Sequence, residues 1–308
     1  MKKYIKIAGN VIMAAALVFV VKKLLDMDVS PSQFRSGRVL AALVAGAVIQ
    51  TFIIIFSSIP WLLFTRSLSG VRIPFSSAMP VYTRSNIYKY LPGNVFQYVG
   101  RNQLAADMKI SHVDVACATI LDILFSVLWA GIFSVKLLGA RIAELLEKYG
   151  RNFILVGAAG TALAAVLVIV LRMKFRDKFR EYISRYSKAF EKGRRGQLAG
   201  GISYYFANNA VSAAMYFICM ALIVPDASVK EQIVLTGAFM FAWIVGFVTP
   251  GAPGGIGIRE GVMIFVSGDR YSDRIILFVL VMRISSVIAD VAAFVTGRIY
   301  LKIKQNGR

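Results

Sequence analysis

The sequence has very few of the side chains that enzymes use for acid–base, nucleophilic or metal chemistry. It contains one histidine, His112, and only two cysteines, Cys117 and Cys219. These numbers exclude a disulfide-rich scaffold and leave no histidines and cysteines at metal-binding spacing. The phosphate-binding loop GxxxxGKS/T is also missing, so the chain carries no recognisable ATPase of its own. We therefore expect no metal, no cofactor and no catalytic residues.

Charged residues are rare and are missing altogether from several long stretches. They make up 17% of the chain against 57% hydrophobic residues, and the mean hydropathy is +0.66, whereas a soluble domain has about a quarter charged residues. No charge occurs in residues 39–65, 152–171 or 196–225. Each stretch reaches the ~20 residues that a membrane-spanning helix needs. The sequence therefore predicts an all-α polytopic membrane protein.

The charge that is present is mostly positive. The chain has 36 Lys and Arg against 16 Asp and Glu, a formal net charge of +20. Such an excess also occurs in nucleic-acid-binding proteins, but here the basic residues gather at the ends of apolar runs. The positive-inside bias and attraction to anionic lipid explain that position. We expect membrane lipids as partners and no nucleic acid.

The apolar pattern contains about six full membrane spans and two interrupted segments. The full spans are predicted at 5–24, 38–64, 112–137, 151–171, 198–223 and 273–299. The interrupted segments are 74–105, broken at Pro92-Gly93, and 230–268, broken at Pro250 and Pro253 within TPGAPGGIGIREG. Non-helical backbone at membrane depth survives only inside protein or beside a watery cavity. Both segments are therefore predicted to be re-entrant hairpins with these residues as hinges.

The two halves of the chain share one order of elements: span, span, broken hairpin, span. Residues 1–308 would form a single integral membrane domain, with pseudo-repeats 1–140 and 150–308 joined by an outer loop. Three crossings in each half would insert the second half upside down relative to the first. This inverted repeat is the plan of many transporters, in which broken helices meet at the binding site.

The most basic loop predicts the orientation of the chain. Residues 172–195 hold ten Lys or Arg against three acids, so the loop at 172–197 should be cytoplasmic. Counting crossings from this loop places both termini in the cytoplasm and the protein in the inner or plasma membrane. The loop also predicts an amphipathic helix, with apolar side chains at Phe175, Phe179, Tyr182, Ile183, Tyr186 and Phe190. A simple anchor on the inner leaflet and regulation by anionic lipid both fit this helix.

The motif at 249–261 has the features of an anion site. A helix that ends near Thr249 and one that begins near Ile256 or Ile258 leave free backbone groups between them. The N–H groups of the second helix and the positive end of its dipole attract anions. Glycines at three positions would let the oxygens of a ligand approach the backbone closely. They are Gly254, Gly255 and Gly257.

Two charged residues follow these glycines. Arg259 offers a planar fork of donors suited to a phosphate. Glu260 could pair with an arginine, or accept a hydrogen bond from a head-group amine or hydroxyl. The alternative is a tight turn with an internal ion pair that only holds the hairpin. We favour lipid-phosphate binding.

Charged residues within the spans are the other candidates. Arg283 and Asp290 lie seven residues apart, and therefore on one face of the last span. A charge at mid-membrane costs ~2.5–3.5 kcal/mol on insertion scales, so these residues need partners. We expect Arg283 to pair with Glu260, and Asp290 or Asp122 to pair with Arg101. A structural network and a polar cavity for a charged substrate both remain open.

Other polar residues are interpreted as structural. Asn208 and Asn209 in the fifth span are expected to hydrogen-bond between helices. Lys89 lies among the tyrosines of the first hairpin, where an aromatic belt at the membrane interface explains the pattern. Head-group recognition is the alternative there.

These motifs resemble the lysylphosphatidylglycerol synthase transmembrane-domain family, the flippase-like part of multiple peptide resistance factor proteins. Residues 253–260, PGGIGIRE, are similar to the family signature PGGxGxRE, and YLPG at 90–93 followed by Arg101 resembles its Y-x-PG…R segment. Arg283 sits where the family commonly has an arginine in its last helix. Leu121-Asp122 resembles the end of an acidic-Arg-x-x-Asp element, but its Glu-Arg pair is absent, with Ala118 and Thr119 nearby.

The resemblance implies a protein that translocates or handles an anionic phospholipid or polyprenyl-linked lipid between leaflets without ATP. In that role Arg259 and the glycines would hold the phosphate. Two further arginines would line the path, and three carboxylates would balance charge or carry coupled protons. They are Arg283 and Arg101, and Glu260, Asp122 and Asp290.

Two alternatives stay open. The chain could be a non-catalytic accessory subunit of envelope glycan or lipid synthesis, with envelope biosynthesis enzymes as partners. It could instead transfer a group such as an aminoacyl residue to a lipid. The soluble aminoacyl-transferase domain of the bifunctional family members has no counterpart in these 308 residues. The pattern sets no oligomeric state.

Overall fold

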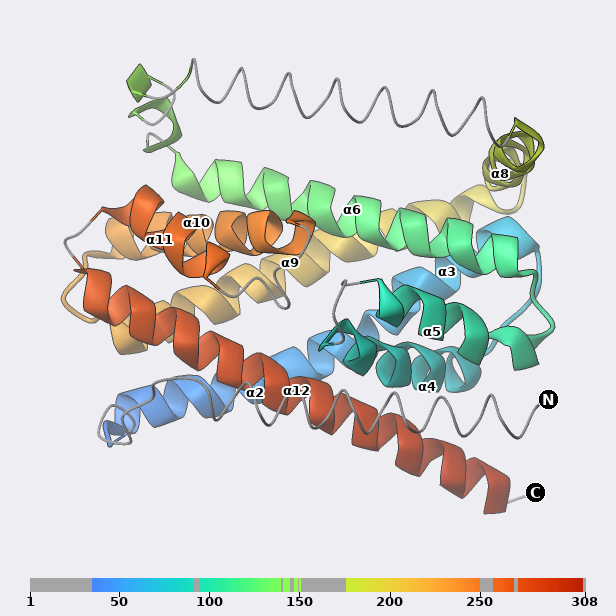
Figure 1. Ribbon diagram of the computed structural model, residues 1–308, viewed down its shortest axis with the longest axis horizontal. Coiled ribbons are helices and arrows are strands. Elements are labelled where there is room, and N and C mark those ends of the chain that lie inside the picture. Colours follow the sequence, from blue (N-terminus) through green and yellow to red (C-terminus); the bar gives the residue numbers. More distant parts are fainter. Residues whose placement is uncertain are drawn as a thin grey trace.

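The computed structural model describes residues 35–90, 95–139, 141–144, 147–148, 150, 176–249, 257–268 and 271–306. Within these ranges it contains helices and no strand (Figure 1). The predicted spans at 5–24 and 151–171 lie outside the described residues. So do the predicted hinges Pro92, Gly93, Pro250 and Pro253.

The helices fall into a longer and a shorter set. The longer helices are α2 (Gly37–Phe56), α6 (His112–Leu138), α9 (Arg195–Ile223), α10 (Val229–Val248) and α12 (Ser272–Asn306). The shorter ones are α3 (Ser58–Ser69), α4 (Phe75–Asn86), η2 (Ile87–Tyr90), α5 (Phe96–Leu104), η3 (Ala106–Met108), α8 (Arg176–Lys188) and α11 (Ile258–Ser267).

Five segments of the described chain are long and apolar enough to cross a membrane. They are Gly37–Ser69, His112–Leu138, Arg195–Ile223, Val229–Val248 and Ser272–Lys304. Four of them coincide with predicted full spans. The fifth, α10, differs from the predicted half-spanning limb, because its 20 residues rise ~30 Å, the thickness of the hydrocarbon core. The protein is an all-α polytopic membrane protein.

The first interrupted segment keeps the dimensions of a half-spanning hairpin. Its helix α4 has 12 residues and α5 has 9. They rise ~18 Å and ~14 Å, well short of the hydrocarbon core. On the two sides of the predicted break, the described helices are η2, which reaches Tyr90, and α5, which begins at Phe96.

One predicted span is divided into two helices. The sequence predicts a continuous helix here, but α2 ends at Phe56 and α3 begins at Ser58. Pro60 explains the division, because its ring lacks an N–H and clashes with the carbonyl four residues earlier, that of Phe56. The chain therefore bends near the middle of this span.

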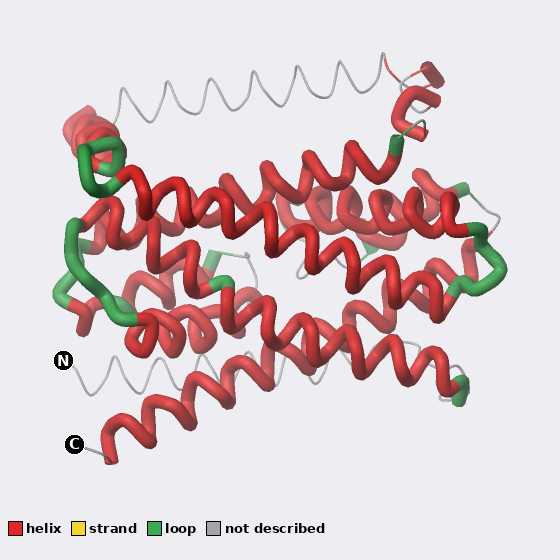
Figure 2. Tube along the Cα trace, turned by 180° about the vertical axis from the view of Figure 1, so that it is seen from behind, coloured by secondary structure: helices red, strands yellow, loops and turns green. Residues whose placement is uncertain are grey.

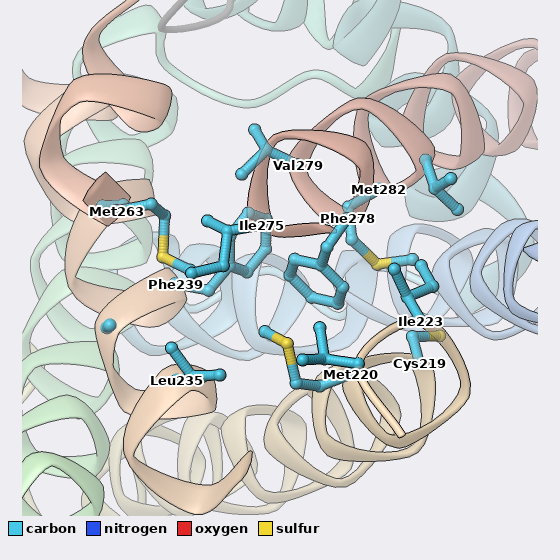
Figure 3. Close-up of a cluster of buried hydrophobic side chains, with 14 of the residues drawn as sticks. Cys219, Met220, Ile223, Leu235, Phe239, Met263, Ile275, Phe278, Val279 and Met282 are labelled. Atoms are coloured by element: carbon cyan, nitrogen blue, oxygen red, sulfur yellow. The ribbon is translucent and has the colours of Figure 1, made fainter. Parts of the chain in front are cut away.

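Two hydrophobic cores hold the helices together. The first lies mainly among α9, α10, α11 and α12 (Figure 3) and includes Met220, Phe239, Met263, Phe278 and Met282. The second lies among α3, α4, α6 and α9 and is built around Trp61 and Phe64. Because α9 contributes to both cores, it joins the two ends of the bundle.

Glycines let the long helices approach each other closely. A Cβ on Gly46 would lie 2.8 Å from Ser285 Oγ, and a Cβ on Gly237 would lie 2.8 Å from the backbone nitrogen of Leu138. Contacts of this kind are common between membrane helices, whose association depends on close packing. They hold α2 against α12 and α10 against α6.

The two interrupted segments lie at opposite ends of the bundle. Figure 1 places α4 and α5 at one end, and α10 and α11 at the other. The view from behind in Figure 2 shows the long helices running along the bundle, with most loops gathered at its two ends. The segments therefore approach the middle of the protein from opposite sides.

The predicted amphipathic helix of the basic loop is α8. Tyr182 and Tyr186 pack against the second core, whereas Ile183 is 55% exposed and Phe190 just beyond the helix is 60% exposed. One face of the helix thus docks on the bundle and another faces outward. Phe175 and the side chain of Phe179 lie outside the described residues.

Candidate functional site

A cavity of about 310 Å³, lined by charged, polar and apolar side chains, lies between the two interrupted segments. The longer helices line it, together with α4, η2, α5 and α11. Its charged lining residues are Lys89, Arg101, Asp122, Arg259, Arg283 and Asp290. All of them except Lys89 are site residues predicted from the sequence, which the fold thus gathers around one space.

The cavity lies near the middle of the membrane-spanning helices. Asn208 lines it from the centre of Arg195–Ile223, and Ile53 lines it from the centre of Gly37–Ser69. Asp290 lines it from the centre of α12. A polar cavity at that depth removes the need for its charged groups to face hydrocarbon.

The Arg101–Asp122 pair forms part of the cavity wall. Arg101 is 2% exposed, its Nη1 lies 2.8 Å from Asp122 Oδ2, and its guanidinium carbon lies 3.8 Å from the centre of the Tyr82 ring. The hydroxyls of Tyr82 and Tyr205 donate to the two oxygens of Asp122. Of the two carboxylates considered as partners of Arg101, Asp122 is the one that pairs with it in the structure.

Asp290 is held by the first interrupted segment instead. Its carboxylate accepts from Asn86 Nδ2 at 2.6 Å and from the Tyr90 hydroxyl at 2.5 Å, and it pairs with Lys89 Nζ at 2.7 Å. The interfacial interpretation of Lys89 is therefore wrong for its ammonium group, which points into the protein.

The second interrupted segment supplies the third ion pair. Arg283 Nη2 lies 2.9 Å from Glu260 Oε1, the pairing expected from the sequence. Glu260 Oε2 also accepts from the backbone N–H of Gly257 at 2.9 Å, and Gly257 has a φ of 81°, which favours glycine. α11 begins at Ile258 as predicted. Gly254 and Gly255 lie outside the described residues.

Arg259 differs from the other cations of the cavity. No ion pair or hydrogen bond joins its side chain to the described part of the chain, and its buried Nε has no partner there. Around the cavity, Lys89, Arg101 and Arg283 each face a carboxylate. Among the described residues, four cations and three carboxylates leave one uncompensated positive charge, and it belongs to Arg259.

Neutral polar side chains complete the wall of the cavity. Gln50, Ser126, Asn208 and Asn209 line it from α2, α6 and α9. Asn209 does not make the expected hydrogen bond between helices. Its Nδ2 instead donates to Tyr205 O at 2.9 Å within α9. The side-chain amides of Gln50 and Asn208 make no hydrogen bond to described residues. Sequence reasoning missed Gln50, although it interrupts an otherwise apolar run.

The described residues include no group of three or more His, Cys, Asp or Glu side chains that could hold a metal ion. Cys117 and Cys219 are both free and buried. Among the described residues, the polar groups around the cavity are ion pairs, phenols, hydroxyls, amides and the guanidinium of Arg259. These groups suit the binding of an anion that also bears hydrogen-bonding groups.

The sequence was compared with models of known protein families and with curated proteins. A family model described as "Lysylphosphatidylglycerol synthase TM region" matches residues 6–293. No curated protein matches the chain. The match covers the two interrupted segments and all charged residues of the cavity.

Proposed function

We propose, since the chain belongs to the family of the lysylphosphatidylglycerol synthase TM region, that it moves an anionic lipid between the two membrane leaflets without ATP. The family indicates a membrane protein with a lipid-related function. The observation that supports the finer proposal is the free guanidinium of Arg259 in a polar cavity at mid-membrane depth. A cation at mid-membrane depth without a carboxylate is costly, and a bound phosphate would remove that cost.

Binding of the phosphate follows from the geometry of α11. An arginine presents a planar fork of N–H donors that matches two phosphate oxygens. Arg259 lies in the first turn of α11, where the positive end of the helix dipole adds to its attraction for an anion. The polar head group would occupy the cavity while the acyl chains stay in the bilayer.

Movement of the head group requires that the cavity open to each side in turn. The two interrupted segments approach the cavity from opposite ends, so a displacement of either one would change access from one side. This is the way in which transporters with broken helices alternate their access. The three internal ion pairs would keep the rest of the route neutral, so that the phosphate interacts chiefly with Arg259.

Reconstitution into vesicles tests this proposal. The vesicles would contain phosphatidylglycerol with a fluorescent acyl chain, and a membrane-impermeant quencher would report how fast the lipid from the inner leaflet reaches the outer one. Arg259→Gln should slow this transfer by about ten- to a hundredfold, because a hydrogen bond to a charged group contributes about 1.5–3 kcal/mol.

The matched control is Arg274→Gln. Arg274 lies on α12, pairs with Asp226 and does not line the cavity, so its replacement should leave the transfer rate unchanged. Unchanged transfer in folded Arg259→Gln protein would contradict the role of Arg259. Absence of transfer in wild-type vesicles would contradict the proposed function itself.

A further inference from the structure

We infer that the lipid bound at Arg259 has a single phosphodiester charge and an uncharged head group that carries hydroxyls, such as glycerol or a sugar. This inference rests on the proposed function and names its substrate class. Three features of the cavity support it: the net charge, the state of its carboxylates and a pair of free amides.

The net charge of the cavity limits the charge of the ligand. Among the described residues, Arg259 is the cation that no carboxylate neutralises. The loop at 250–256, which precedes α11 in the sequence, contains no acidic residue. A phosphodiester carries one negative charge and matches this single cation. A phosphomonoester or a pyrophosphate would bring additional negative charge into a site that cannot balance it.

The carboxylates of the cavity are all engaged, so an ammonium group would find no free counter-ion. Asp122 is paired with Arg101, Asp290 with Lys89 and Glu260 with Arg283. A head group with an amine would have to break one of these pairs or remain uncompensated in a buried site. The cavity is therefore unsuited to an aminoacylated or ethanolamine head group.

The free amides provide the contacts for hydroxyl groups. Gln50 follows the charge-free and apolar stretch from Val39 to Ile49 in α2, and it faces the cavity. Asn208 faces the same cavity from α9, which packs against α2. An amide both donates and accepts hydrogen bonds, as a hydroxyl does. Leaving two amides unsatisfied at this depth would be costly, so a ligand or water must meet them.

Matched lipids separate the contribution of the hydroxyls from that of the charge. Phosphatidylglycerol and phosphatidylethanol each have one phosphodiester charge, but only phosphatidylglycerol has head-group hydroxyls. Wild-type protein in vesicles should transfer fluorescent phosphatidylglycerol about three- to thirtyfold faster than phosphatidylethanol, as expected for one or two hydrogen bonds. An aminoacylated phosphatidylglycerol should be transferred more slowly than phosphatidylglycerol.

Two variants assign this preference to the amides. Gln50→Met and Asn208→Leu each replace an amide by an apolar side chain of similar size. Each should slow phosphatidylglycerol toward the phosphatidylethanol rate, so that the ratio of the two rates falls. Arg259→Gln should instead slow both lipids equally. Using two amide variants guards against misfolding of either one, which size-exclusion chromatography would detect.

The outcomes distinguish the two proposals. Equal transfer of phosphatidylglycerol and phosphatidylethanol by the wild type would overturn the inference and leave anionic lipid transfer intact. Equally fast transfer of the aminoacylated lipid, or an unchanged preference in folded Gln50→Met and Asn208→Leu proteins, would overturn it as well. If the wild type transfers none of the lipids, both proposals fail.

Discussion

Two arginines line the same cavity, and their surroundings are opposite. Arg101 is 2% exposed, is paired with Asp122 and lies over an aromatic ring. Arg259 lines the cavity without an ion pair or hydrogen bond to the described residues. The difference shows that residue type and membrane depth alone do not distinguish a ligand-binding arginine from a structural one. An arginine whose donors are already engaged supports the structure, and a free one is available to a ligand.

The partners of Arg101 also explain why the first interrupted segment is stable inside the bundle. The ion pair joins α5 to α6, and the Tyr205 hydroxyl from α9 donates to the same carboxylate. Gly100 next to Arg101 lets α5 approach Tyr88 so closely that a Cβ there would lie 2.2 Å from the ring. Close packing and the ion pair together therefore hold the part of the cavity wall around Arg101 in place.

The largest expected effect is the loss of the partner of Arg101. Asp122→Ala leaves a buried guanidinium without its carboxylate, which should lower the free energy of unfolding by about 3–5 kcal/mol. Thermal unfolding of the detergent-solubilised protein would measure this loss. The double variant Arg101→Met with Asp122→Ala should recover part of the stability, since no charge is then left unpaired. A small loss in the single variant would remove the contrast between the two arginines.

An intermediate effect is expected at the Arg283–Glu260 pair, whose side chains are 11% and 27% exposed. Glu260→Gln keeps an acceptor for the N–H of Gly257 but removes the negative charge, and should lower the free energy of unfolding by about 1–2 kcal/mol. It also raises the net positive charge of the cavity by one. Phosphatidic acid, which carries more negative charge than phosphatidylglycerol, should then be transferred faster relative to phosphatidylglycerol than in the wild type. An unchanged ratio would argue against charge matching.

The smallest change in stability is expected for Arg259→Gln. No partner of Arg259 within the described chain is lost, and an uncompensated cation is removed from mid-membrane depth. The unfolding temperature should be no lower than that of the wild type, although lipid transfer falls. Destabilisation as large as that of Asp122→Ala would make Arg259 a structural residue like Arg101.

Helix-breaking residues and the cost of charge in a membrane span predicted some parts of the site directly from the sequence. The ends of α10 and α11 follow from the prolines and glycines between them, and the pairing of Arg283 with Glu260 follows from the cost of charge in a span. The partner of Asp290 could not be predicted in this way. Lys89 reaches it only because the fold brings η2 beside α12.

Two further features depend on tertiary context in the same way. Gln50 looked like an isolated polar residue in an apolar run, and its importance depends on which face of α2 meets the cavity. The division between α2 and α3 was missed because Pro60 lies within a stretch apolar enough to span the membrane. Hydropathy reports the medium around a helix, whereas a bend within it depends on single backbone groups.

The 35-residue helix α12 has a mechanical consequence. It forms an ion pair with the first interrupted segment through Asp290 and with the second through Arg283. These two residues lie seven positions apart on the same helix. A shift or rotation of α12 would therefore displace both segments at the same time. In the proposed transport cycle, a movement of one segment would therefore be transmitted to the other through α12 itself, without any change in the solvent or the lipid.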